Sequence, residues 1–150
     1  MSDPTLLVST DWLADHLSSP DIRILDGSYH LPGAGRDAKA EYAEAHIPGA
    51  RFFDTEAIAD PKSSLPHMLP PVEKFVSSVR RLGIGDGHRV VVYDQAGMFS
   101  AARVWWMFRV FGHEDIAVLD GGLPKWMAEG RAVEDLSVDP RDRHFTARRD

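Results

Sequence analysis

A strand, loop and helix pattern across residues 89–108 restricts the possible folds of this chain more than any other stretch. It begins with an apolar run rich in β-branched residues, which suits a strand buried on both faces of a parallel sheet. A short polar loop containing Gly97 follows, and the pattern becomes helical at Ser100, a residue that favours the N-cap position. This is the geometry with which α/β proteins hold anions or activated nucleophiles. The first loop residue is Asp94, so a functional interpretation must explain an acid at this point.

Predicted strands and helices alternate along the rest of the chain. We expect strands at 22–26, 50–53 and 116–119, and helices at 9–17, 37–45, 70–82, 100–111 and 123–129. The alternation predicts an α/β fold, a parallel sheet covered by helices on both faces. The helix at 100–111 is apolar nearly all round, which predicts that it is buried. We interpret residues 1–135 as one domain and the polar residues 136–150 as the start of a linker between domains.

Composition excludes several classes of function. The 150 residues carry a formal net charge of −6, which argues against a nucleic-acid partner because phosphate binding needs a basic face. The chain has no cysteine, so it has no thiolate nucleophile of its own. The histidines lack acidic or thiolate companions at ligand spacing, and we predict neither a metal nor a cofactor. Without a signal peptide or an apolar run of about 20 residues, we expect a cytoplasmic protein that makes no contact with membranes.

Seven motifs follow one another along the chain. They are Val8-Ser9-Thr10-Asp11-Trp12-Leu13, Ile24-Leu25-Asp26, Tyr42 with His46-Ile47-Pro48-Gly49-Ala50, His67-Met68-Leu69-Pro70, Val91-Val92-Tyr93-Asp94, Arg103-Val104-Trp105-Trp106-Met107-Phe108-Arg109 and Asp120-Gly121-Gly122-Leu123-Pro124-Lys125-Trp126. In this order they resemble the rhodanese family, specifically the N-terminal half of its two-domain thiosulfate and 3-mercaptopyruvate sulfurtransferases. The resemblance extends over most of the chain and implies a five-stranded parallel sheet flanked by helices.

The resemblance gives the acid after the central strand a specific meaning. In the catalytic half of these enzymes a Cys follows that strand, and a helix N-terminus of this kind can lower a Cys pKa to about 3.5–7.5. Here Asp94 occupies the matching position; a carboxylate with a reference pKa of about 3.9 is ionised at pH 7 but cannot carry sulfane sulfur. We therefore predict no catalytic residue in this chain and a degenerate active-site loop, in which Asp94 is a built-in anion stabilised by about 0.3–1 kcal/mol of helix dipole. The loop consists of Asp94, Gln95, Ala96, Gly97, Met98, Phe99 and Ser100.

The resemblance also implies a substrate-binding residue and a partner. His67, in its His-Met-Leu-Pro context, would face the cleft and bind the substrate's carboxylate or carbonyl; alternatively it only caps the helix that starts at Pro70. The partner would be a Cys-containing C-terminal domain of the same parent chain, with a small-molecule sulfur donor in the cleft between the two. The alternative function is a stand-alone, catalytically inactive rhodanese-like module for binding or regulation.

Four other polar residues have structural interpretations. We expect His46 to hold its turn through a ring nitrogen and Asp26 to be a buried hydrogen-bonding residue. Arg103 and Arg109 lie on an otherwise apolar helix, where a buried charge needs a partner. We therefore expect them to pair with carboxylates or to face a domain interface rather than to bind substrate.

Overall fold

A computed structural model describes residues 7–30, 35–54, 72–85, 87–96 and 100–135. The elements are β1 (Leu7–Val8), α1 (Thr10–Asp15), β2 (Ile22–Asp26), α2 (Ala38–Glu44), β3 (Arg51–Phe52), α4 (Val72–Arg81), β4 (Arg89–Tyr93), α5 (Ala101–Val110), β5 (Ile116–Leu119) and α6 (Gly122–Ala128). The predicted strands and helices are all present, with bounds that agree to within a few residues. No helix in these ranges is long and apolar enough to cross a membrane.

The five strands form one parallel sheet in the order β1-β5-β4-β2-β3. β4 lies in the middle because its side chains are apolar on both faces, whereas the two edge strands are only two residues long. In the β2–β4 register Asp26 lies beside Tyr93. The carboxyl ends of these strands are therefore neighbours, and the acids Asp26 and Asp94 come together there.

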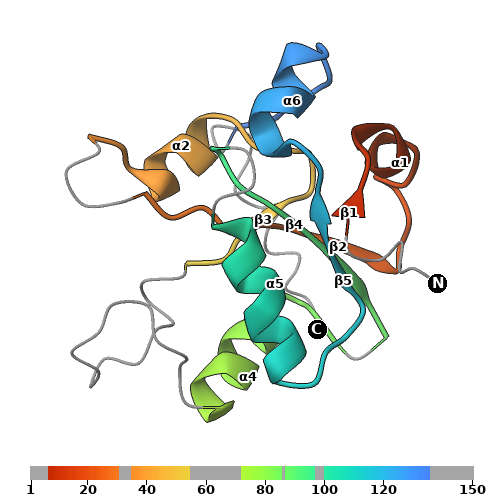
Figure 1. Cartoon of the computed structure of the whole chain (residues 1–150), viewed down its shortest axis with the longest axis vertical. Helices are drawn as coiled ribbons and strands as arrows, with labels where there is room; N and C mark the ends of the chain where they lie inside the picture. The colour runs from red at the N-terminus through yellow and green to blue at the C-terminus, as the bar shows by residue number, and fades with distance from the viewer. Residues whose placement is uncertain (1–6, 31–34, 55–71, 86, 97–99, 136–150) are drawn as a thin grey trace.

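Helices cover both faces of the sheet, which confirms the predicted α/β architecture. Successive side chains of β4 point to opposite faces. Val90 and Val92 pack into one core with α4 and α5, while Val91 and Tyr93 pack into a second core with α1 and α6. Figure 1 shows α4 and α5 together on one side, and α1 and α6 on the other.

The prediction that the helix at 100–111 is buried is confirmed only for the side that faces the sheet. Met107 and Phe108 of α5 are buried against the sheet, but Trp106 is 43% exposed and Val110 is 47% exposed. A helix that lies on one face of a sheet buries only the stripe that it turns toward that face. The sequence identified α5 as apolar but did not show that one apolar side would be left uncovered.

Candidate functional site

Asp94 links the end of β4 to the start of α5. Its carboxylate is fully buried; Oδ1 accepts the Ala96 N–H at 2.9 Å and Oδ2 accepts the Ala101 N–H at 2.8 Å. Ala101 is the first residue of α5, where a helix has unpaired N–H groups and a positive dipole end. Asp94 thus supplies a negative charge inside its own loop.

Ser100 occupies the predicted N-cap position, but its side chain does not cap α5. Its backbone is already helical, with φ −91° and ψ −17°, and its hydroxyl accepts the N–H of Tyr29 at 3.0 Å. The Asp94 carboxylate takes the capping role instead. Ser100 therefore ties the loop after β2 to the start of α5.

Gln95 connects the two acids through its side chain. Its Nε2 donates to Asp26 Oδ2 and to the Ala38 carbonyl, each at 3.0 Å, and its Oε1 lies 2.9 Å from His30 Nε2. Because an amide oxygen only accepts, His30 is the donor in this contact. The Gln95 N–H donates to the Ser28 hydroxyl at 2.9 Å. The side-chain amide and the backbone N–H of Gln95 are thus bonded within the protein, and neither is presented to a ligand.

Asp26 is the buried carboxylate at the centre of this network. Burial raises the pKa of Asp26, and the nearby Asp94 charge adds to that rise. Hydrogen bonds from the Ser28 hydroxyl, the Gln95 amide and the Ser28 N–H oppose the rise without cancelling it. Asp26 has the structural hydrogen-bonding role that was predicted for it.

His46 also has the predicted structural role. Its Nδ1 lies 2.7 Å from the Tyr42 carbonyl, and its ring stacks on the Tyr42 ring with centroids 4.2 Å apart. On the other side, His46 Nε2 lies 3.3 Å from a Glu134 carboxylate oxygen that also accepts the Gly49 N–H. The ring holds the Ile-Pro-Gly turn and joins it to the segment that follows α6.

Neither arginine of α5 makes an ion pair within the described ranges. Arg109 donates to the Glu114 carbonyl and stacks on Trp105 at 5.0 Å. Arg103 stacks on Trp106 at 5.6 Å, and its buried Nε has no hydrogen-bond partner. Of the two predicted environments, pairing with carboxylates is not found in this part of the chain, and a domain interface stays a prediction.

His67, Gly97, Met98 and Phe99 lie outside the described residues. Within them, no group of three or more His, Asp or Glu side chains is placed to hold a metal ion. The Asp94 oxygens are buried and bonded to backbone N–H groups, so this carboxylate is not positioned as a nucleophile or a general base.

Sequence reasoning missed Ser28 and His30 as members of this site. A signal for Ser28 was present, because a Ser two residues after a strand-ending Asp fits an Asx turn. No local pattern identifies His30, which meets Gln95 across 65 residues of sequence.

Comparison with known proteins gives one consistent family. The model of the rhodanese-like domain matches residues 9–129. Thiosulfate/3-mercaptopyruvate sulfurtransferase 1, mitochondrial, of Arabidopsis thaliana is 57% identical over 85% of this chain and 34% of its own length. Human 3-mercaptopyruvate sulfurtransferase is 43% identical over 100% of this chain and 54% of its own length. The crystal structure of SseA, a 3-mercaptopyruvate sulfotransferase from Escherichia coli, superposes with a TM-score of 0.83 at 45% identity, covering 87% of this chain and 50% of that one.

The chain belongs to the rhodanese-like domain family, as its motifs indicated. It spans only about a third to a half of the length of these curated relatives. The match therefore corresponds to one domain of a larger relative.

Replacing Asp94 by Ala tests the capping role of the carboxylate. It leaves the N–H groups of Ala96 and Ala101 without their acceptors, so we expect the free energy of unfolding to fall by about 2 kcal/mol. Urea unfolding measures this loss. The matched control is Asp120→Ala, which removes an exposed acid at the end of neighbouring β5 and should change stability by less than about 0.5 kcal/mol. Equal losses in the two variants would contradict the capping role.

The raised pKa of Asp26 predicts a pH dependence of stability. The folded protein binds the Asp26 proton more tightly than the unfolded chain, whose Asp pKa is about 3.9. The contribution of Asp26 to the free energy of unfolding is therefore greatest below that pH and falls as pH rises through the raised pKa. In Asp26→Asn this fall is absent. Urea unfolding from pH 4 to pH 7 should show the wild-type value decreasing relative to the variant; a constant or increasing difference would contradict the burial argument.

Proposed function

We propose that this chain is the Cys-less half of a sulfurtransferase that moves sulfane sulfur from 3-mercaptopyruvate or thiosulfate to a thiophilic acceptor such as cyanide. The observation that carries the proposal is the Asp94 carboxylate, which occupies the N–H groups at the start of α5. It stands where the family resemblance places a sulfur-carrying thiolate. The names of the relatives support the same class of reaction.

This half does not carry sulfur itself. A persulfide needs a thiolate, and the chain contains no Cys. The buried negative charge of Asp94 also disfavours the approach of anionic donors to this loop. The thiolate belongs to a second, Cys-containing domain of the parent protein, and the sulfur passes from donor to that thiolate and then to the acceptor.

The role of this half is to complete the substrate cleft and to dock the catalytic half. Four large apolar side chains on α4 and α5, two helices of the same sheet face, support the docking role. They are Val72, Val76, Trp106 and Val110, each 37–49% exposed. Large apolar side chains left exposed on one face of a domain are typical of protein interfaces. The guanidinium of Arg103 lies over the exposed Trp106 ring and adds a positive charge beside these apolar side chains.

Thiocyanate production from 3-mercaptopyruvate, and separately from thiosulfate, with cyanide as acceptor tests the proposal. We expect no activity from the 150-residue chain, because no residue in it carries sulfur. We expect activity from a longer chain that continues beyond Asp150 in the native gene. Turnover by the 150-residue chain alone would overturn the proposal. Absence of activity from both chains would favour the inactive binding module instead.

In the active longer chain, His67→Ala tests the cleft role of this histidine. Loss of a hydrogen bond to a substrate carboxylate should raise KM for 3-mercaptopyruvate about tenfold. The control is His16→Ala, which changes the histidine at the C-cap of α1 that stacks on Trp12 and should leave KM within about twofold of the unchanged enzyme. Equal KM values for His67→Ala and the control would assign His67 to helix capping only.

A further inference from the structure

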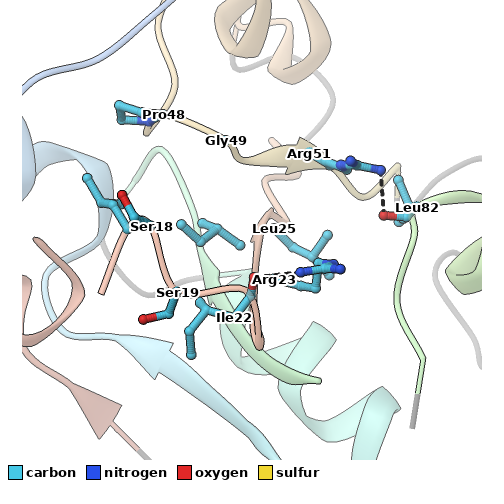
Figure 2. A pocket seen from close by; sticks show the side chains of 11 residues that line it. Ser18, Ser19, Ile22, Arg23, Leu25, Pro48, Gly49, Arg51 and Leu82 are labelled. Carbon is cyan, nitrogen blue, oxygen red and sulfur yellow. Dashed lines mark hydrogen bonds between the residues drawn. The ribbon is translucent and has the colours of Figure 1, made fainter. Parts of the chain in front are cut away.

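A small cavity opens at the β3 edge of the sheet, apart from the Asp94 loop. It encloses about 210 Å³ and is lined by residues of β2 and β3, the turn before β3 and the end of α4, as Figure 2 shows. The cavity exists because β3 pairs only with Leu25 and Asp26, so the first half of β2 has no strand beside it on this side. Its wall includes the arginines Arg23 and Arg51.

The two guanidinium groups reach the same place from neighbouring strands. In Figure 2 both point toward the end of α4: Arg51 Nη1 donates to the Leu82 carbonyl at 2.8 Å, and Arg23 Nε donates to the Gly83 carbonyl at 3.0 Å. Gly83 has φ +82°, a conformation that favours glycine, and the Arg51 Nη1 atom lies 2.9 Å from where a Cβ would be at that position. A guanidinium has five N–H donors, and the Leu82 carbonyl uses only one of those of Arg51.

The positive charge at this place is not neutralised by the described residues. Neither Arg23 nor Arg51 forms an ion pair with an acid among them. Burial and then the Arg51 charge lower the pKa of Arg23, and the weaker opposing effect of Asp21 does not restore it. The C-terminus of α4 supplies only about half a negative charge, which leaves the two arginines in excess.

We propose that Arg23 and Arg51 form a binding site for a small oxyanion, such as sulfate, thiosulfate or phosphate, at the mouth of this cavity. The planar fork of each guanidinium matches the oxygen spacing of such an anion. Arg51 is exposed and has donors to spare, whereas Arg23 is partly buried and its Nη1 also donates to the Pro20 and Ile22 carbonyls, which leaves Arg23 Nη2 for an anion. The cavity is smaller than the roughly 300–1,000 Å³ of sites for drug-sized ligands, which favours an inorganic anion over a nucleotide.

Amide NMR titration of the 150-residue chain tests the site. Sodium sulfate, sodium thiosulfate and sodium phosphate are added separately, with ionic strength held constant by sodium chloride. We expect saturable shifts of the Gly49, Arg51 and Gly83 amides with at least one oxyanion, and the order of the three affinities identifies the preferred anion. Because no sulfur transfer is involved, this outcome is independent of the proposed sulfurtransferase function.

Two variants make the assignment specific. Arg51→Gln keeps a polar side chain but loses the guanidinium, and we expect at least about tenfold weaker binding. The matched control is Arg89→Gln, which removes an arginine of the same sheet that is already paired with Asp115, and its affinity should stay within about twofold of the unchanged chain. Shifts no different from those with chloride alone, shifts confined to the Ala96 and Ala101 amides, or unchanged binding by Arg51→Gln would each overturn the proposal. The location of the shifts is read on the unchanged chain, so this part of the test holds even where a variant does not fold.

Discussion

The bonds from the Ala96 and Ala101 N–H groups to the Asp94 carboxylate hold the central strand to the helix that follows it. β4 is buried on both faces, and its chain must leave the sheet and enter α5 through one short loop. The carboxylate satisfies donors at both ends of that loop, and it does so where the helix dipole is positive. The Gln95 network then holds the same loop to the end of β2. The local structure therefore depends on the Asp94 carboxylate, an acidic group that belongs to the chain itself.

This arrangement bears directly on chemistry. A loop that is to receive an anionic sulfur donor needs N–H groups that are still free when the donor arrives. Here the donors at Ala96 and Ala101 are already bonded to a buried acid, and that acid cannot be displaced because it is covalently part of the strand. The structure is therefore a stable scaffold at the position where the family resemblance places the reactive group. Under the proposed function the reactive group therefore comes from outside this chain, which is the reason for proposing a second domain.

Much of this was accessible from the sequence, and the exceptions share one physical cause. The apolar run of β4, the helix-forming residues 37–45 and the acid that ends β2 are local patterns, and each led to the element observed. The partners of those acids are not local. Gln95 meets His30 and Ala38 only because β2 and β4 are adjacent, and Ser100 turns to Tyr29 for the same reason. Likewise, the apolar residues around α5 predicted a core helix. Which side of α5 stayed exposed depends on the elements that pack against it, and the local sequence does not specify them.

The uncovered side of α5 and the oxyanion cavity differ in what they require of a partner. Trp106 and Val110 are apolar and are satisfied by burial, which a single small ligand cannot provide. Arg23 and Arg51 carry charge at an open strand edge, and burial against an apolar surface would cost free energy unless an anion came with it. One surface therefore suits a protein domain and the other suits a small ion. The cavity lies at β3 and the uncovered apolar side lies on α5, so the two surfaces are on different elements of the fold. Neither surface includes the Asp94 carboxylate, which is buried and bonded to the Ala96 and Ala101 N–H groups.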